Sequence, residues 1–150
     1  MPGILVGVDG SDHSRRALSW AMREAAAHQV PLTVMAVYQQ APRPATQIYW
    51  NVPTLPEGSP DPELARTAVR KWVDTVADED GQTEPEIVVD IRTGDAAEEL
   101  VNASYDADLL VVGSRGSGVW AQLLLGSVSS KAVHHAACPI VVVPGSRQAP

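Results

Sequence analysis

Short apolar runs alternate along this chain with longer stretches in which apolar residues recur every three to four positions. Residues 4–8, ILVGV, form the first such run and contain no charged side chain. A run of this kind is typical of a parallel strand that is covered on both faces. In the stretch that follows, the apolar residues on one helical face are Ala17, Leu18, Ala21, Met22 and Ala25. The pattern predicts a buried strand and then an amphipathic helix, with Ser11 or Asp12 as its N-cap.

The same alternation continues to the end of the chain. The further strands that it predicts cover residues 32–38, 85–92, 108–113 and 138–144, and the further helices cover residues 61–77, 94–104 and 126–137. Strands that alternate with helices in this way indicate an α/β fold with right-handed crossovers between parallel strands. We expect a single domain over residues 1–150, built as a three-layer, doubly wound sheet of five parallel strands in the order 3-2-1-4-5.

One segment departs from this alternation. Residues 39–60 are expected to form a long loop, because five prolines block regular structure there: Pro42, Pro44, Pro53, Pro56 and Pro60. A loop of this length inside a compact domain is more often functional or mobile than accidental. Residues 145–150, at the end of the chain, are expected to be a flexible tail.

Composition narrows the classes of protein that this chain can represent. Hydrophobic residues make up 45% and charged residues 19%, which is typical of a soluble globular protein. The formal net charge of −7 argues against a general affinity for nucleic acid or an anionic membrane, because both need a basic face. No apolar run reaches the ~20 residues of a membrane span, so a cytoplasmic location is expected. The single cysteine, Cys138, excludes an internal disulfide and is expected to be an inert thiol.

The expected strand order would place a ligand crevice between strands one and four. In doubly wound sheets, ligands bind beyond the carboxyl ends of the two strands where the winding reverses. Here those ends run into an acidic turn, VDGS at 8–11, and a glycine-rich turn, VGSRGSG at 112–118. Glycines let backbone amides approach phosphate oxygens. The helix predicted to begin at Gly126-Ser127 would direct its positive dipole end toward the same anion.

Individual side chains near this crevice suit the parts of a nucleotide. The hydroxyls of Ser127 and Ser129 can donate to phosphate, and Arg115 is a fixed cation in the glycine-rich turn. Asp9 would repel a phosphate, so we expect it to meet a base, ribose hydroxyls or a bound Mg²⁺. Glycines after a strand also serve tight turns, however, and their spacing alone favours neither interpretation. The pattern is not a P-loop, which needs Gly-Lys-Ser/Thr, nor a dinucleotide fingerprint, which follows the first strand.

A longer motif and its flanks carry a resemblance to a known family. The spacing G-x2-G-x9-G-[S/T] is present without a gap as Gly113, Gly116, Gly126 and Ser127. The segments LLVVGSRGSG and ACPIVVVP and the opening ILVGVDGSDHSRRAL fit the same family. Over essentially its whole length the chain resembles the universal stress protein family, in its single-domain, ATP-binding, actinobacterial form. The resemblance implies a fold like that of the adenine nucleotide alpha hydrolases.

By this resemblance, particular residues would hold ATP together with Mg²⁺. Asp9 would lie near the adenosine with the backbone of Gly7 beneath it, and Val37 would offer its backbone to the adenine edge. Gly113 would lie beside the ribose. The residues that would hold the triphosphate are Gly116, Gly126, Ser127, Val128 and Ser129, with Arg115, Ser117 and Gly118 in the same loop. We expect no catalytic residue and no metal site formed by protein ligands alone.

The last predicted strand suggests how the chain assembles. Its apolar residues Ile140–Val143 are expected at an edge of the sheet, and an apolar edge must be covered. Pairing of this strand with its own copy would produce a two-fold homodimer. The family resemblance implies the same arrangement.

Three functions remain open on the sequence alone. The first is a largely non-enzymatic, nucleotide-dependent regulator of a stress response, with slow ATP hydrolysis or cyclic AMP binding as variants of it. It is favoured because the motif supplies phosphate ligands but no evident general base. The second is an adenylating enzyme of the PP-loop type, since DGSDHS resembles a Ser-Gly-Gly-x-Asp-Ser loop that lacks its second glycine. The third is a structural protein whose glycine loop is empty. Residues expected to be structural or solvated are His13, His28, His134, His135, Asp78, Glu79 and Asp80.

Overall fold

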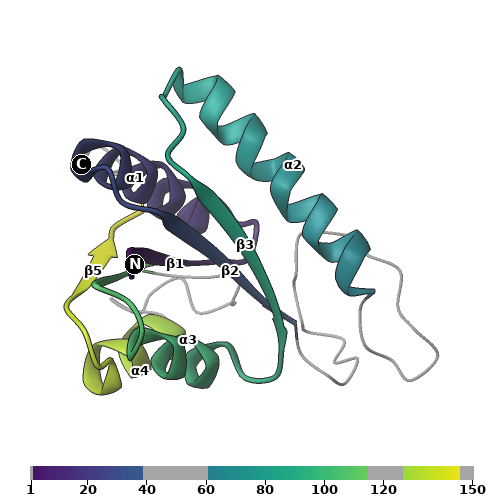
Figure 1. Cartoon of the computed structure of the whole chain (residues 1–150). Helices are drawn as coiled ribbons and strands as arrows, with labels where there is room; N and C mark the ends of the chain where they lie inside the picture. Colours follow the sequence, from purple (N-terminus) through teal and green to yellow (C-terminus); the bar gives the residue numbers. More distant parts are fainter. Residues whose placement is uncertain (1, 39–60, 115–126, 146–150) are drawn as a thin grey trace, which may run out of the picture.

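The computed structural model describes residues 2–38, 61–114 and 127–145 (Figure 1). The predictions for the proline-rich segment 39–60, for residues 115–126 and for the tail after residue 145 lie outside the described residues. The strands are β1 (Ile4–Val8), β2 (Leu32–Tyr38), β3 (Ile87–Thr93), β4 (Leu109–Gly113) and β5 (Ile140–Val143). The helices are α1 (Asp12–His28), α2 (Pro62–Asp80), α3 (Ala96–Ser104) and α4 (Ser127–His135).

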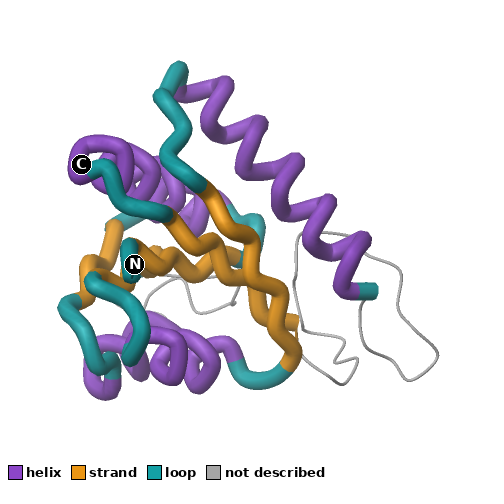
Figure 2. The backbone as a smooth tube through the Cα atoms, in the orientation of Figure 1, coloured by secondary structure: helices purple, strands orange, loops and turns teal. Residues whose placement is uncertain are grey.

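The described strands form one parallel sheet with the order β3-β2-β1-β4-β5, as the sequence predicts. Helices α1 and α2 cover one face of this sheet, and α3 and α4 cover the other (Figure 1; Figure 2). Within β1, Val6 belongs to the core beneath α1 and α2, whereas Leu5 belongs to the core beneath α3 and α4. Cover on both faces explains why β1, β2, β4 and β5 contain no charged residue.

Two helix ends differ from the predicted ones for local reasons. We predict the end of α2 at Ala77, but the helix continues to Asp80, where Gly81 takes a left-handed φ of 62° and its amide donates back into the last turn. Helix α4 ends earlier than predicted, at His135. Strand β5 begins only after Pro139, which has no amide to give to a sheet.

A polar contact at the surface fixes α1 to the end of α2. The hydroxyl of Ser19 in α1 donates to the carboxylate of Asp80. Arg15 donates to the same carboxylate at 3.2 Å and to Glu79 at 2.7 Å. Gln82 donates its side-chain amide to the hydroxyl of Ser19 at 3.0 Å. Asp80 thus lies at the surface, as expected, but its carboxylate has partners on a helix far away in the sequence.

These partners change the acidity of Asp80. The hydrogen bond from Ser19 lowers the pKa of the Asp80 carboxyl below its ordinary value, with support from Arg15 and against the opposing effect of burial. When the pKa of a carboxyl is lower in the folded state than in the unfolded state, the ionised group stabilises the protein. This contribution is present in full at pH values above the unfolded-state pKa. This contribution is lost as the pH falls through the folded-state pKa.

We expect Asp80→Asn to lower the free energy of unfolding by about 1 kcal/mol at neutral pH, because the charge-assisted bonds to α1 are lost at a partly exposed position. The difference from the wild type should shrink as the pH is lowered from roughly 5 to 2, when the wild-type carboxylate takes up a proton. Urea unfolding across this range measures the effect. Asp106→Asn, at an exposed aspartate after α3, is the control and should change little. A loss that does not vary with pH would contradict the role of the ionised carboxylate.

Candidate functional site

The turn that follows β1 is fixed by a short network of hydrogen bonds. Asp9 accepts a bond from the backbone amide of Ser11 at 2.9 Å and donates its own amide to the hydroxyl of Ser14 at 3.2 Å. Gly10 between them has a φ of 83°, which glycine adopts without strain. Ser11 is the N-cap of α1, one of the two predicted positions, and its hydroxyl accepts from the amide of Ser14. The half-buried Asp9 is therefore held in place at the carboxyl edge of the sheet.

A contact between α4 and the end of β4 closes the second turn. Gly113 is the last residue of β4, and the next residue, Ser114, donates its amide to Val143 at 2.9 Å. The carbonyl of Ser114 accepts a hydrogen bond from the hydroxyl of Ser129 in α4 at 3.1 Å. Ser129 is only 2% exposed, so this bond is buried. The described chain on either side of residues 115–126 is thereby held together, with the first turn of α4 beside the end of β4.

The two turns follow neighbouring strands at the carboxyl end of the sheet. Strands β1 and β4 are hydrogen-bonded neighbours, with Val6 opposite Val111. The pairing ends at these two residues, and Asp9 and Ser114 each follow it by three positions on the carboxyl side. The prediction that the winding reverses between the first and fourth strands is therefore confirmed.

The predicted site residues divide into those that the structure describes and those that it does not. The described ones are Gly7, Asp9, Val37, Gly113, Ser127, Val128 and Ser129, whereas Arg115, Gly116, Ser117, Gly118 and Gly126 lie outside the described residues. The described ones all lie near the carboxyl end of a strand or in the first turn of α4. Ser127 is exposed and Val128 is half-buried. The hydroxyl of Ser129, predicted to donate to phosphate, donates to the backbone of Ser114.

Gly7 allows a close approach between β1 and α3. A Cβ atom on Gly7 would lie 2.7 Å from Cδ1 and 3.0 Å from Cδ2 of Leu100, whose side chain is buried. Carbon atoms that are not bonded to one another stay about 3.5 Å or more apart, so a larger residue here would displace Leu100. Sequence reasoning misses this constraint because the residue that imposes it lies in a distant helix.

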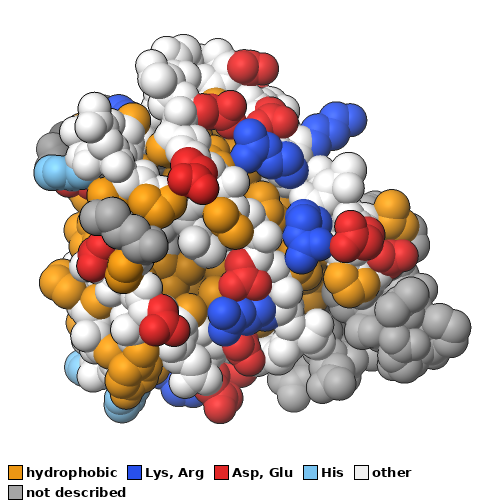
Figure 3. All heavy atoms as spheres, viewed as in Figure 1, with side chains coloured by type: hydrophobic (Ala, Val, Ile, Leu, Met, Phe, Trp, Pro, Cys, Tyr) orange, Lys and Arg blue, Asp and Glu red, His pale blue; other side chains and the backbone are white. Residues whose placement is uncertain are grey.

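An ion-paired group borders the same edge on the face covered by α3 and α4. Arg92 of β3 lies 3.1 Å from Asp90 and 3.2 Å from Glu99 of α3. Lys131 of α4 lies 3.5 Å from Asp95, the N-cap of α3. Figure 3 shows that basic and acidic side chains are interleaved rather than gathered by sign on the side of the molecule seen in Figure 1. Sequence reasoning, which concentrates on the glycine motif, misses this group.

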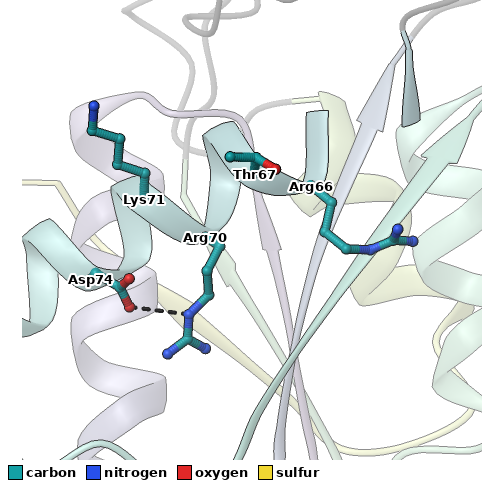
Figure 4. A pocket seen from close by; sticks show the side chains of 5 residues that line it. All are labelled: Arg66, Thr67, Arg70, Lys71 and Asp74. Carbon is teal, nitrogen blue, oxygen red and sulfur yellow. Dashed lines mark ion pairs between the residues drawn. The ribbon is translucent and has the colours of Figure 1, made fainter. Parts of the chain in front are cut away.

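A shallow hollow of about 380 Å³ lies elsewhere, on α2 (Figure 4). Its described lining residues are Arg66, Thr67, Arg70, Lys71 and Asp74, all from that helix. Arg70 is paired with Asp74 at 3.1 Å, and Arg66 donates to the backbone carbonyl of Val89 in β3 at 3.5 Å. Because two of its cations already have protein partners, we assign no ligand to this hollow.

Other candidate chemistry has ordinary explanations. Within the described ranges, no group of three or more His, Cys, Asp or Glu residues could hold a metal ion. His28 pairs with Glu24 at 2.9 Å, and the rings of His134 and His135 lie 6.4 Å apart. Burial raises the pKa of the Cys138 thiol, which disfavours the reactive thiolate. No helix in the described part of the chain is long and apolar enough to cross a membrane.

Comparison with known proteins agrees with this architecture. The sequence matches the Universal stress protein family over residues 2–144. The chain belongs to this family. A universal stress protein of Mycolicibacterium smegmatis is 41% identical over 150 residues, which cover 98% of this chain and 49% of that protein. A universal stress protein of Mycobacterium tuberculosis is 37% identical over 144 residues, which cover 94% of this chain and 47% of that protein. This chain spans about half the length of these curated relatives.

Solved structures of universal stress proteins share the fold. UspA from Lactobacillus plantarum superposes with a TM-score of 0.67 at 24% identity, over 95% of this chain and 97% of that one. A universal stress protein in complex with cAMP superposes with a TM-score of 0.65 at 26% identity, over 97% of this chain and 98% of that one. The predicted fold class and the predicted family are both confirmed.

We expect Gly7→Ala to destabilise the protein by about 1–3 kcal/mol, because the added methyl group displaces Leu100. Leu100→Ala alone should cost about 2–5 kcal/mol through the cavity that it leaves. The double variant should be more stable than the sum of these losses predicts, since the smaller side chain makes room for the methyl group. Urea unfolding of the four proteins measures this coupling. Simple additivity of the two losses would show that the contact does not limit residue 7.

Proposed function

We propose that this universal stress protein binds an adenine nucleotide, ATP with Mg²⁺, at the carboxyl edge of β1 and β4. The observation that carries the proposal is the buried bond between Ser129 and Ser114, which sets the first turn of α4 next to the end of β4. Asp9 follows β1, the strand that pairs with β4. A helix N-terminus in this position offers backbone amides and a positive dipole end to phosphate. The related structure in complex with cAMP, at 26% identity, supports the binding of an adenine nucleotide by this fold.

The predicted residues take distinct roles in this proposal. The phosphates would meet the amides at the start of α4, at Ser127 and Val128, while Ser129 holds that turn in place. Gly113 would lie beside the ribose and Asp9 near the adenosine. Gly7 would lie beneath the nucleoside, and Val37 would meet the adenine edge. The remaining phosphate ligands, proposed from the motif alone, are Arg115, Gly116, Ser117, Gly118 and Gly126.

Mg²⁺ would be held mainly by the nucleotide. This ion is usually bound through one or two carboxylates together with phosphate oxygens, and it keeps several waters. Asp9 is a carboxylate at the edge, and its Oδ1 accepts a bond from Ser11 at 2.9 Å that fixes its orientation. Since this carboxylate is proposed to lie near the adenosine, phosphate oxygens and waters would supply the ligands of the ion. When bound, the ion would neutralise part of the charge of the triphosphate.

We propose a regulatory role in the stress response without a catalytic step. Phosphoryl transfer needs a residue that orients the nucleophile in addition to phosphate ligands. Two charged side chains near the edge, Lys131 and Arg92, are already paired with carboxylates. Slow ATP hydrolysis by the same site is the weaker alternative. Cyclic AMP is the second candidate ligand, and the related structure that contains it is the observation in its favour.

We also propose a two-fold homodimer formed through β5. The edge strands of the described sheet are β3 and β5. The β3 edge carries charge, because Asp90 and Arg92 lie in the strand. Arg66 also donates to the backbone carbonyl of Val89 in β3. In contrast, β5 (Ile140–Val143) consists of apolar residues only. An apolar edge without charged protection is a template for pairing, and the copy of the same strand is a suitable partner.

We expect protein stripped of nucleotide to bind ATP in calorimetric titrations, more tightly with Mg²⁺ and more tightly than AMP or cyclic AMP. Ser127→Pro should weaken ATP binding by roughly tenfold or more, because it removes one amide at the first helical position, where proline is tolerated. Ser127→Ala keeps that amide and removes only the hydroxyl, so it should weaken ATP binding less than Ser127→Pro does. Tighter binding of cyclic AMP would favour the second candidate. No heat and no rise in melting temperature with any adenine nucleotide would contradict the proposed function.

For the dimer, sedimentation equilibrium at micromolar concentration should give twice the mass of the chain. Ile140→Lys should weaken association by about 1 kcal/mol, because it places like charges near each other across the two-fold axis. Val88→Lys is the matched control on β3, where the native side chain is 49% exposed, and it should leave association unchanged. A monomer mass for the wild type at every concentration is the result that excludes the dimer.

A further inference from the structure

Arg92 occupies a position at the base end of the proposed site. It lies in β3 directly opposite Val37 of β2, the residue proposed to meet the adenine edge. Neighbouring strands are about 5 Å apart, so the two backbones are in contact. On the other side of β2, strand β1 pairs as far as Val8 opposite Ala36, and Asp9 is the next residue after that pair. Arg92 and Val37 therefore lie opposite each other at the carboxyl end of the sheet, and Asp9 follows the next strand along.

The side chains of Arg92 and Val37 lie on the face of the sheet that α3 and α4 cover. Arg92 reaches the face covered by α3, where it donates to Glu99. Val37 packs on the same face, against the core that contains Leu100 and Ala132 of α3 and α4. The first turn of α4, where the phosphates are proposed to bind, belongs to this side as well. A nucleotide with its phosphates at α4 and its base at Val37 would thus have Arg92 next to the base.

The guanidinium of Arg92 is held in a fixed position. Its Nε and Nη2 atoms donate to Asp90 at 3.2 and 3.1 Å, and its Nη1 atom donates to Glu99 at 3.2 Å. Each of the three nitrogens therefore has a carboxylate partner. The side chain nevertheless remains 35% exposed. These hydrogen bonds occupy the edge of the planar guanidinium and leave a face for stacking. Guanidinium faces stack on aromatic rings.

We propose that Arg92 is a base-contacting residue that closes the nucleotide site at β3 by stacking its guanidinium on the nucleobase. The inference rests on the proposed function, because it needs the base to lie at Val37. Stacking accepts every base, since each has a π face. Arg92 would therefore add affinity for a nucleobase without selecting adenine, and the selection would be left to the backbone of Val37.

A purely structural role is the competing explanation. Arg92 joins β3 to α3 through Glu99, so its loss could weaken the fold and, through the fold, any ligand. The two explanations differ in which part of the nucleotide is affected. Stacking predicts a loss that depends on the base, whereas a displaced α3 or a missing positive charge would weaken phosphate binding too. Lysine at this position keeps the charge but has no planar face.

The test compares the wild type with Arg92→Lys by calorimetric titration with three probes: ATP, GTP and inorganic tripolyphosphate. We expect Arg92→Lys to weaken ATP and GTP by a similar factor of about ten, in line with the usual worth of one stacked base. Tripolyphosphate, which has no base, should bind the variant and the wild type equally. Arg66→Lys is the matched control, because that arginine contacts β3 from α2, on the opposite side. It should leave the affinity for all three probes unchanged.

The outcomes separate this inference from the function on which it rests. A wild type that binds none of the three probes overturns the proposed function, and the inference falls with it. A wild type that binds ATP, together with an Arg92→Lys variant that binds it equally well, overturns only the role of Arg92. Equal losses for ATP and tripolyphosphate would assign Arg92 to charge or structure instead. Urea unfolding of each variant shows whether a loss of binding follows a loss of stability.

Discussion

Burial of a parallel sheet on both faces is the constraint from which the site follows. Each strand must be covered on either side, and since α1 and α2 take one face, α3 and α4 must take the other. The chain achieves this by reversing its winding between β1 and β4. The turns that begin at Asp9 and Ser114 therefore follow paired strands, although they lie far apart in the sequence. The candidate site is thus a consequence of how the apolar runs are covered.

Four buried serines hold the backbone in place after the carboxyl ends of β1 and β4. Ser11, Ser14, Ser114 and Ser129 are all buried, and the hydroxyls of Ser14 and Ser129 donate to backbone carbonyls. A serine hydroxyl is small enough to be buried beside the backbone and polar enough to satisfy a carbonyl that has no partner in the sheet. Such bonds fix the backbone on both sides of the crevice before any ligand arrives. Amides that are already in position lose less freedom when an anion binds.

Periodicity predicts the elements and their order because it depends on one element at a time. Periodicity does not show the contacts between elements that are distant in the sequence, and the residues in those contacts can take more than one role. Ser129 has the chemistry of a phosphate donor, yet its hydroxyl serves the backbone of Ser114. Gly7 is small because Leu100 packs against it. The sequence does contain a pattern that could indicate Arg92, because this residue alternates with Asp90 along β3. Charge on an edge strand is, however, ordinarily interpreted as solvent exposure.

A protein with a net charge of −7 can still attract an anion, because salt screens exposed charges beyond about 10 Å. Near the crevice, Arg92 and Lys131 are paired with carboxylates and add little net charge. Of the described residues, those at the start of helix α4 are therefore the remaining source of attraction, beside the contribution proposed for Arg115. The other helices carry an acidic residue in the first turn: Asp12 in α1, Glu63 in α2, and Glu98 and Glu99 in α3. Helix α4 carries none, so its positive dipole end has no acidic side chain of its own turn to balance it. Of the described helices, it is the one best suited to balance that charge with a phosphate.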